Sequence, residues 1–574
     1  MKTFNELKKN LKKDYNSFTK VDLAILGDSA TQLLNVSIKG CSYEYKINLN
    51  IYEADYNQIE YEILNQDSNL YKVQPKYILI YFSSKKLIDK FYSIPLNERE
   101  GFAKSYTENV IELIQVAQSK LNESIILLCN FQEIDDSIFG HQANKISKSF
   151  LYQCRKINFL LSEYTLEKNN VLIVDLAGLQ NKYGIERCFN SNIYISTEMV
   201  LSTDILPNVA EIILNIINVR LGVLHKCVIL DLDNTLWGGV IGDDGYENIE
   251  IGTLGIGKAF TEFQKWLKEL KHRGIILAVC SKNNESVAKE AFLKNKEMVL
   301  KLEDISVFMA NWDNKADNIK TIQSILNIGF SSMVFIDDNP VERQIVKENI
   351  PEITVPNLPE DPACYLEYLY GLNLFENTGI TSEDSNRTNL YQIEHQRLNL
   401  KKSFVDEKEF LKSLEMLSLV EGFNKNNLSR VAQLSQRSNQ FNLRTVRYDE
   451  SDIINYESSN QYENFTFTLN DKFGENGLIC VVVLKQTKEA TMFMENWFMS
   501  CRVLKRGMEN FVLNTIVNKM KLKGVKHIEG EYIPSTKNQI VVNHYNDLGF
   551  TETNGKWVLD INSFLERETY INFK

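Results

Sequence analysis

The sequence is poor in the features that mark secreted, membrane-spanning and zinc-binding proteins. Its nine cysteines are scattered without a Cys-x-x-Cys pair, and its six histidines are equally scattered. This spacing indicates neither a disulfide framework nor a zinc site, and it favours a reducing cytoplasm. The best candidate for a membrane span, residues 205–224, is interrupted by Glu211 and Arg220, and the amino terminus lacks the apolar core of a secretory signal. We therefore expect a cytoplasmic protein without a membrane partner.

An excess of positive charge is also missing. The chain has 64 Lys and Arg against 75 Asp and Glu, which gives a formal net charge of −11. Proteins that bind nucleic acids cluster basic residues against the phosphate backbone, so we do not expect nucleic acid as a partner. A length of 574 residues with 44% hydrophobic residues is typical of about three globular domains.

Apolar runs alternate with helical patterns over residues 1–222. The runs that read as strands are Val21–Leu26, Tyr77–Phe82, Ile125–Cys129 and Val171–Leu176. This alternation predicts a parallel α/β sheet.

A second α/β series covers residues 223–372. Its strand-like runs are Cys227–Leu230, Ile275–Cys280 and Met333–Ile336, and each is followed directly by polar residues. In an open parallel sheet the carboxyl ends of the strands form one crevice, so we expect these polar residues to converge there.

The rest of the chain predicts a linker and an α+β domain. Residues 373–406 read as a helical linker, with a capping box at Thr381–Asp384 before a polar helix. In the α+β domain, residues 407–574, we expect a strand from about Glu407, a helix near Leu428–Ser438, three further strands and a long helix from Gly507; the three further strands are Phe465–Leu469, Leu478–Leu484 and Ala490–Phe498. The fold class predicted for the whole chain is multidomain α/β.

Two carboxylates follow the first strand of the second series, in the segment Asp231-Leu-Asp-Asn-Thr-Leu-Trp-Gly-Gly239. Phosphoryl transfer requires a nucleophile, a proton carrier, a divalent metal and a cation for the phosphoryl oxygens. A carboxylate at a strand end can serve as the nucleophile, and a second carboxylate two residues later can carry the proton. Asp231 and Asp233 are the candidates for these two roles.

The remaining parts follow in order along the chain. Ser281 and Lys282 stand at the end of the next strand as candidate phosphate-binding groups, and Lys315 offers a positive charge for the phosphoryl oxygens. Asp337 and Asp338 follow the last strand and supply the hard oxygen ligands that Mg²⁺ prefers.

These segments resemble the four motifs of the haloacid dehalogenase (HAD) superfamily, in the superfamily's order. The resemblance implies that Asp231 is nucleophile and Mg²⁺ ligand and that Asp233 is the general acid/base, with its backbone carbonyl on the metal. It further implies that Ser281 and Lys315 hold the phosphoryl group and that Asp337 binds Mg²⁺, with Asp338 beside it. The short segment between Thr235 and the helix near Lys258 leaves no room for a cap domain, so another domain or a macromolecule is expected to cover the site.

A closer resemblance is to FkbH-like proteins, which form HAD subfamily IIIC. It rests on residues 231–245, Ser281-Lys-Asn-Asn-Glu285, Asn311-Trp312, Phe335-Ile-Asp-Asp-Asn-Pro340 and residues 355–362. The family implies a glyceryltransferase/phosphatase that takes 1,3-bisphosphoglycerate, removes phosphate and loads a D-glyceryl thioester onto the phosphopantetheine arm of an acyl carrier protein. The unit then enters polyketide or related biosynthesis.

The carboxyl-terminal domain resembles the N-acetyltransferase (GNAT) fold. The segment Cys501-Arg-Val-Leu-Lys-Arg-Gly507 is similar to its phosphate-binding loop, with Arg502 and Gly507 as expected binding residues, although Lys505 replaces the first glycine. Tyr545-Asn-Asp-Leu-Gly-Phe550 resembles the closing motif. An acyl-transfer route needs a thiol, for which Cys501 is the first candidate with His544 as a conceivable base, and Cys280 is the second.

The amino-terminal domain resembles SGNH esterases through Leu26-Gly-Asp-Ser-Ala30, with Ser29 at the nucleophile position. That family pairs an Asp with a His three residues later, whereas Asp204 is followed by Pro207. Proline cannot act as a base, and nothing in the sequence places His141 near Ser29. We expect a scaffold without hydrolytic activity.

Three hypotheses remain open. The first is the glyceryltransferase/phosphatase, the second is a phosphatase of a small or sugar phosphate, and the third is a non-catalytic adaptor for a carrier protein.

Overall fold

The computed structural model describes residues 2–377 and 406–574 except 439, 536 and 554, and also residues 393, 397, 400, 401 and 404. The predicted capping box at Thr381–Asp384 and most of the predicted linker, residues 373–406, lie outside the described residues. The chain divides into two compact units, Met1–Asn218 and Val219–Lys574. Within the described part of the chain, every helix is too short or too polar to span a bilayer.

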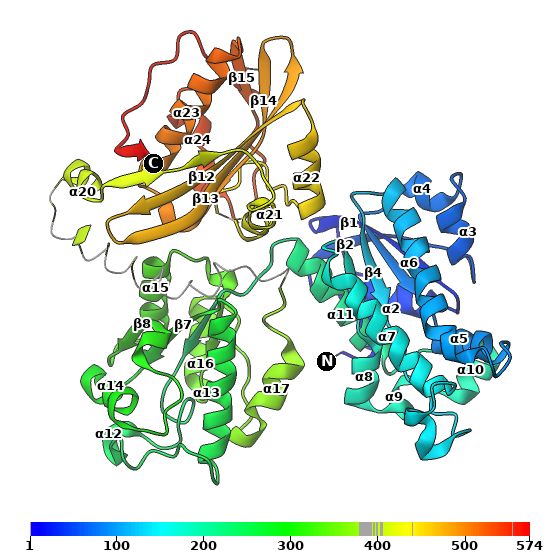
Figure 1. The fold of residues 1–574 in the computed structure, drawn as a ribbon. Coiled ribbons are helices and arrows are strands. Elements are labelled where there is room, and N and C mark those ends of the chain that lie inside the picture. Colours follow the sequence, from blue (N-terminus) through cyan, green and yellow to red (C-terminus); the bar gives the residue numbers. More distant parts are fainter. Residues whose placement is uncertain are drawn as a thin grey trace. The chain divides into compact units, whose positions relative to one another are not determined.

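The first unit contains a five-stranded parallel sheet with the strand order β2-β1-β3-β4-β5 (Figure 1). Its strands are β1 (Thr19–Gly27), β2 (Ile47–Glu53), β3 (Tyr77–Tyr81), β4 (Ile125–Cys129) and β5 (Val171–Val174). The central strands β3 and β4 are buried along their whole length. This burial explains why they read as continuous apolar runs in the sequence.

Helices connect these parallel strands. They are α1 (Phe4–Asn10), α2 (Gln32–Ser42), α3 (Ile59–Leu64), α4 (Asn69–Val73), α5 (Ser84–Tyr92), α6 (Phe102–Lys120), α7 (Phe150–Leu166), α8 (Leu176–Tyr183), α9 (Ile185–Cys188), α10 (Ser191–Thr197) and α11 (Leu206–Arg220). Helices α6 and α7 place residues such as Ile114 and Ile157 against Ile78 and Ile126 of the sheet in one hydrophobic core. The predicted α/β sheet of this region is therefore present.

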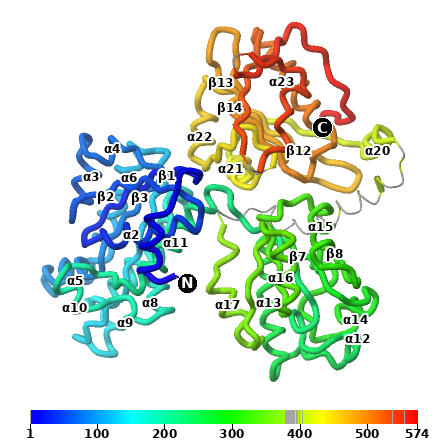
Figure 2. The backbone as a smooth tube through the Cα atoms, turned by 180° about the vertical axis from the view of Figure 1, so that it is seen from behind, coloured from blue at the N-terminus to red at the C-terminus, as the bar shows by residue number. Residues whose placement is uncertain are grey.

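The second unit begins with a four-stranded parallel sheet of order β8-β7-β6-β9. The strands are β6 (Cys227–Leu230), β7 (Ile276–Ser281), β8 (Ile305–Ala310) and β9 (Met333–Ile336). The helices around it are α12 (Ile241–Asp244), α13 (Gly257–His272), α14 (Glu285–Lys294), α15 (Lys315–Leu326), α16 (Pro340–Asn349) and α17 (Tyr365–Leu372) (Figure 2).

The two faces of this sheet carry separate hydrophobic cores. On one face Val228 and Leu230 pack with residues of α13, α14 and α17, such as Phe263. On the other face Cys227 and Ile229 pack with α15 and α16. Because successive side chains of a strand point to opposite faces, β6 must be apolar at every position and is followed at once by a polar loop. The four strands thus hold their carboxyl-end loops on a rigid base.

The carboxyl-terminal part forms a mixed sheet, which in the described residues has the order β16-β17-β15-β14-β13-β12-β10-β18, with β11 paired to β12. Its strands are β10 (Met416–Ser418), β11 (Val420–Glu421), β12 (Tyr462–Asp471), β13 (Gly474–Lys488), β14 (Thr491–Met499), β15 (His527–Gly530), β16 (Thr551–Thr553), β17 (Lys556–Asp560) and β18 (Ile571–Phe573). Its helices are α20 (Glu407–Ser413), α21 (Leu428–Arg437), α22 (Glu450–Ser458), α23 (Met508–Leu522) and α24 (His544–Asp547).

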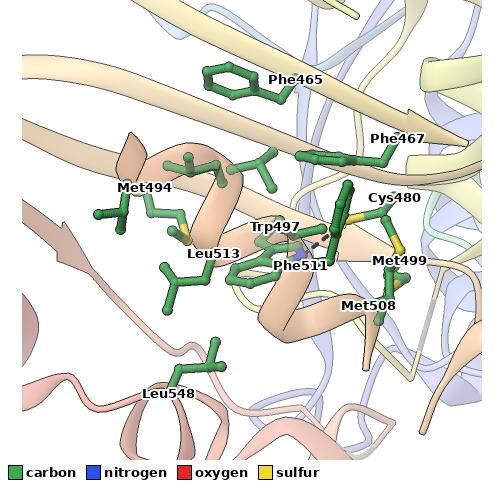
Figure 3. Close-up of a cluster of buried hydrophobic side chains, with 14 of the residues drawn as sticks. Phe465, Phe467, Cys480, Met494, Trp497, Met499, Met508, Phe511, Leu513 and Leu548 are labelled. Carbon is green, nitrogen blue, oxygen red and sulfur yellow. Dashed lines mark hydrogen bonds between the residues drawn. The ribbon is translucent and has the colours of Figure 1, made fainter. Parts of the chain in front are cut away.

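Aromatic and sulfur-containing side chains fill the larger core of this sheet. Trp497 of β14 is fully buried, and its indole N–H donates to the Cys480 Sγ of β13 at 3.2 Å (Figure 3). Phe511 and Met508 of α23 belong to the same cluster. This core fixes α23 on the sheet and therefore fixes the loop that precedes it, residues 500–507.

Candidate phosphoryl-transfer site

The strand order of the four-stranded sheet gathers four predicted residues at one edge. Asp231 follows β6, Ser281 ends β7, Lys315 begins α15 after β8, and Asp337 follows β9. Strand β6 pairs with β7 on one side and with β9 on the other, and β7 pairs with β8. Because all four strands are parallel, their carboxyl ends lie side by side.

Three carboxylates form a compact group at this edge. Ligand oxygens of Asp231, Asp337 and Asp338 all lie within 4.8 Å of one another. Asp337 is fully buried, and Asp231 is 6% exposed. Three hard oxygen ligands at this spacing, one of them on the partly exposed Asp338, fit Mg²⁺, which keeps several waters when protein-bound. These residues would hold the metal, and the metal would neutralise charge on a phosphoryl group.

Lys315 bridges two of these carboxylates. Its Nζ lies 2.9 Å from Asp231 Oδ1 and 2.6 Å from Asp337 Oδ2, and its side chain is only 4% exposed. Burial by itself lowers the pKa of the Lys315 ammonium, but the two carboxylates more than offset this and raise the pKa above its usual value. Lys315 is therefore a permanent buried cation within reach of any group bound to Asp231.

The crowding of acids raises the pKa of two of them. Burial, followed by the charge of Asp231, raises the pKa of Asp337 from 3.8 to about 7, against the opposing effect of Lys315. The same two causes raise the pKa of Asp338. A divalent cation would relieve this repulsion, because it replaces the proton as the partner of the carboxylates.

Backbone contacts fix the loop that carries Asp337 and Asp338. Arg343 of α16 donates from Nη1 to the carbonyl oxygens of Asp337 at 2.8 Å and Asp338 at 2.6 Å. The amide of Asn339 donates to Asp337 Oδ1 at 2.8 Å, and the amide of Asp338 donates to Thr235 Oγ1 at 3.1 Å. Sequence reasoning did not identify Arg343 and Thr235 as supports of this loop, because their contacts join separate parts of the chain.

Asp233 is held apart from the three-carboxylate group. Its Oδ1 accepts hydrogen bonds from the Trp237 indole N–H at 3.0 Å and from the amide of Ile241 at 3.1 Å. Its Oδ2 accepts from Asn283 Nδ2 at 2.9 Å, and the same amide group donates to Ser281 Oγ at 3.1 Å. Asp233 and Ser281 are thus brought together through Asn283, which the sequence did not single out.

Lys282 was predicted to bind phosphate, but in the structure its side chain contacts an acidic residue. Its Nζ forms an ion pair with Glu342 Oε1 of α16 at 2.6 Å.

The segments around the site include one exposed aromatic residue, Trp312, which is 76% exposed between β8 and Lys315. Residues 236–256 contain only the short helix α12 and one antiparallel bridge between Gly238 and Glu250, which is too little for a cap domain.

The structure separates the cysteines by accessibility. All nine lie in the described residues; seven are buried, Cys364 is exposed and Cys501 is partly exposed. Cys280 packs in the core on the side of the sheet opposite to Val279, and burial raises the pKa of its thiol to about 12. Cys280 is thus a poor nucleophile.

Two residues of the loop that follows Cys501 have a left-handed backbone conformation. Gly507 has φ 75°, and Lys505, which replaces the first glycine, also adopts a left-handed conformation with φ 63°. Arg502 donates from Nε to Ser500 Oγ at 3.2 Å, and its buried Nη1 has no partner in the described residues. His544 lies elsewhere, packed against Trp497 with ring centroids 4.5 Å apart, and burial lowers the pKa of its imidazole to about 3. The described residues show no hydrogen bond from His544 Nε2 to any group, Cys501 included.

Ser29 of the amino-terminal unit is not hydrogen-bonded to any base in the described part of the chain. The hydroxyl of Ser29 is buried and without a hydrogen-bond partner among the described residues. The neighbouring Asp28 accepts from the amide of Ser83 at 2.9 Å, and burial raises the pKa of its carboxyl to about 6. His141 lies exposed in a short 3-10 segment, residues 140–145.

Comparison with known proteins finds a family model, a relative of known structure from Bacteroides fragilis and more distant acetyltransferases. The family model of the FkbH N-terminal domain matches residues 22–218. The crystal structure of the N-terminal part of the protein BF1531 from Bacteroides fragilis, which contains a phosphatase domain and was complexed with Mg, is 49% identical to this chain. The match covers 66% of this chain and 100% of that chain, with a TM-score of 0.63. Curated proteins give no match.

Acetyltransferases match only at low similarity. The ribosomal-protein-S18-alanine N-acetyltransferase from Escherichia coli is 16% identical, over 26% of this chain and 99% of that chain, with a TM-score of 0.21. Spermidine N-acetyltransferase from Vibrio cholerae, in complex with CoA and spermine, is 13% identical, over 25% and 96% respectively, also with a TM-score of 0.21.

The relative from Bacteroides fragilis is matched over its whole length, and the FkbH model covers the region that precedes the site. The residues described above also supply the parts of a haloacid-dehalogenase site at the carboxyl edge of one sheet. The chain therefore belongs to the family of FkbH-like proteins that carry a haloacid-dehalogenase-type phosphatase domain.

Proposed function

We propose that this protein is a Mg²⁺-dependent glyceryltransferase/phosphatase that acts on 1,3-bisphosphoglycerate and delivers a glyceryl thioester to an acyl carrier protein. The observation that carries the proposal is the group formed by the buried Asp231, Lys315 and Asp337 with the partly exposed Asp338. The same chain continues into a second sheet with a partly exposed thiol. The proposal includes the division into an SGNH-like domain (1–222), a HAD-like domain (223–372), a linker (373–406) and a GNAT-like domain (407–574).

The phosphatase half of the reaction follows from the geometry of the site. An oxygen of Asp231 attacks the phosphorus of the 3-phosphate ester, the bond to the sugar-acid oxygen breaks, and Asp233 gives that oxygen a proton. Lys315, 2.9 Å from Asp231, and the hydroxyl of Ser281 stabilise the charge on the transferred group. Water then hydrolyses the aspartyl phosphate, with Asp233 taking the proton back.

The acyl half uses the other phosphate of the same substrate. The carbonyl carbon of an acyl phosphate is activated, so a thiolate forms a thioester there while the carbon–oxygen bond to phosphate breaks. Passing the glyceryl group from an enzyme thiol to the thiol of a phosphopantetheine arm exchanges one thioester for another. No external oxidant or reductant is needed, and inorganic phosphate is the by-product of both halves.

Solvent accessibility leaves two of the nine cysteines as candidates for the enzyme thiol. An acylated thiol must be reachable by substrate and by the carrier arm, and seven of the nine cysteines are buried. Cys501 stands in the loop before α23, beside Arg502, whose buried Nη1 has no hydrogen-bond partner in the described part of the chain. We therefore keep Cys501 as the proposed acyl-accepting residue and use the exposed Cys364 as its matched control.

The second candidate function is a phosphatase of a small or sugar phosphate. It is favoured by the complete phosphoryl-transfer site and requires no role for Cys501. A third, a carrier-protein adaptor without catalysis, is disfavoured because an unused site has no need to keep Lys315 and two neighbouring acids buried together, which costs stability.

Incubating the full chain with Mg²⁺, 1,3-bisphosphoglycerate and a phosphopantetheinylated carrier protein separates these functions. Phosphate release and the intact mass of both proteins are the readouts. A glyceryl adduct on the carrier supports the transferase. Phosphate release that depends on Asp231, without an adduct on either protein, supports the simple phosphatase. Retained carrier binding with neither product supports the adaptor.

Two cysteine variants test the acyl-accepting residue. Cys501→Ala is expected to abolish the glyceryl-enzyme species, whereas Cys364→Ala leaves it in place. A self-loaded species that persists in Cys501→Ala and is lost in Cys364→Ala would move the assignment to Cys364. In both variants phosphate release from 3-phosphoglycerate should stay within about twofold, because neither thiol is part of the HAD site.

A further inference from the structure

Asp233 is fixed by three donors from three different places in the chain. The Trp237 indole, the amide of Ile241 at the start of α12 and the Asn283 amide group contact it at 3.0, 3.1 and 2.9 Å. Trp237 is fully buried and Asn283 is 4% exposed, so their side chains are held by packing. A carboxylate held in this way cannot rotate to join the three metal-binding acids without breaking several hydrogen bonds.

The pattern of donors distinguishes the two oxygens of Asp233. A carboxylate has about four lone-pair positions, two on each oxygen. Oδ1 uses both of its positions, on Trp237 and Ile241, whereas Oδ2 uses one, on Asn283. Among the described residues no other donor reaches Oδ2, which leaves it one open position. A proton carried by Asp233 therefore sits on Oδ2.

Asn283 connects that oxygen to the phosphate-binding hydroxyl. Its Nδ2 donates one hydrogen to Asp233 Oδ2 and the other to Ser281 Oγ at 3.1 Å. Since Ser281 Oγ accepts from Asn283, its own hydrogen must point elsewhere and is free to donate to a phosphoryl oxygen. One amide group thus aligns the proton carrier and the phosphate-binding hydroxyl with each other.

We propose that Trp237 and Asn283 are positioning residues that lock Asp233 so that Oδ2 delivers the proton to the leaving-group oxygen. This inference rests on the phosphoryl-transfer function proposed above and adds the residues that orient its acid. As the phosphorus–oxygen bond breaks, its electron pair stays on the leaving oxygen, which takes the proton from Asp233 Oδ2. Neither positioning residue touches the substrate.

Comparing kcat/KM for two substrates with different leaving groups shows whether a variant loses the orientation of its acid or is damaged in its structure as a whole. A p-nitrophenolate leaves without a proton, whereas the alkoxide of 3-phosphoglycerate requires one. We expect Trp237→Phe and Asn283→Asp to lower kcat/KM for 3-phosphoglycerate by about 10²-fold, the usual contribution of a general acid. For p-nitrophenyl phosphate the loss should stay below about threefold. The ratio kcat/KM is used because it excludes the later hydrolysis of the aspartyl phosphate, which all substrates share.

Matched controls come from the same domain. Trp266→Phe removes an indole that stacks on Phe263 in the neighbouring core, and Asn284→Asp makes the same chemical change one residue further along. Both are expected to lower the two kcat/KM values by equal, small factors. Equal losses for the two substrates in Trp237→Phe and Asn283→Asp, or no loss in either variant, would overturn the inference while leaving the proposed function intact. Absence of phosphate release that depends on Asp231 in the wild type would overturn both.

Discussion

Replacing Asp337 by Asn should make the metal-free protein more stable at pH 8. Asp337 is fully buried, and burial together with the charge of Asp231 raises its pKa from 3.8 to about 7. The folded protein therefore binds this proton more tightly than the unfolded chain does. Consequently the contribution of Asp337 to stability is fully present below about pH 4 and is lost as the pH rises through about 7.

The pKa sets the size of the effect. One pKa unit corresponds to about 1.4 kcal/mol, so a rise from 3.8 to about 7 gives an upper limit of about 4 kcal/mol. Asparagine resembles the neutral acid in shape, but it gives up the contact with Lys315 at 2.6 Å. We therefore expect a net gain of about 1–3 kcal/mol at pH 8 in the absence of metal, which is part of that upper limit.

Thermal unfolding at pH 5 and pH 8, with EDTA or with Mg²⁺, measures this prediction. A domain of about 150 residues shifts its Tm by roughly 2–4 °C per kcal/mol, so Asp337→Asn should melt several degrees above the wild type at pH 8 in EDTA. At pH 5 the difference in Tm between Asp337→Asn and the wild type should be smaller. Saturating Mg²⁺ should raise the Tm of the wild type, because ligands stabilise the state that binds them, and should leave the variant almost unchanged.

Replacing another buried acid of the same domain, Asp304, by Asn should have the opposite effect on stability. Asp304 pairs with Lys271 at 2.9 Å, and although burial raises the pKa of Asp304, hydrogen bonds and the lysine charges lower it overall. Asp304→Asn should therefore melt below the wild type at pH 8. A metal-free Asp337→Asn protein that is less stable than the wild type at pH 8 would refute the reasoning. So would a variant whose Tm rises with Mg²⁺ as much as the Tm of the wild type does.

Three further outcomes follow from the site. Lys315→Met should lower kcat for phosphate release by about 10²–10³-fold in steady-state assays, because the charge on the transferred group loses its nearest cation. Arg343→Lys should raise the Kd for Mg²⁺, measured by titrating activity, by about tenfold, since one ammonium cannot reproduce the contacts to the carbonyl oxygens of Asp337 and Asp338. Ser29→Ala should leave both phosphate release and glyceryl loading within about twofold, since its hydroxyl has no partner in the described residues; a large loss in carrier loading would show that the amino-terminal unit takes part in catalysis.

Most of the strands that the sequence predicted lie inside their sheets, although the predicted strands β5 and β9 are edge strands. Strands β3, β4 and β6 are buried on both faces and are therefore continuously apolar. In the two parallel sheets, two strands were missed: β2 (Ile47–Glu53) and β8 (Ile305–Ala310). Both are edge strands in their sheets and are only partly buried, so polar residues interrupt the apolar pattern on which the prediction depends.

The candidate site also has features that the sequence predicted and features that it did not. Asp231, Ser281 and Asp337 were predictable, because each stands at the end of an apolar strand or directly after one. Lys315 was found from its motif alone, because the strand before it, β8, was missed. The contacts that orient them were not predictable. The hydrogen bonds from Asn283 to Asp233 span 50 residues, and those from Arg343 to the Asp337 loop depend on the packing of α16. Residue types and spacing identify the chemical groups, whereas only the folded chain shows which oxygen faces which donor.

The mass of the carrier protein after reaction tests the central claim most directly. The full chain is incubated with Mg²⁺, 1,3-bisphosphoglycerate and a phosphopantetheinylated carrier protein, in parallel with Asp231→Asn. The account predicts a glyceryl adduct without phosphate on the carrier for the wild type, and no such dephosphorylated adduct for the variant. An unmodified carrier with the wild type, or the same dephosphorylated adduct with Asp231→Asn, would contradict it.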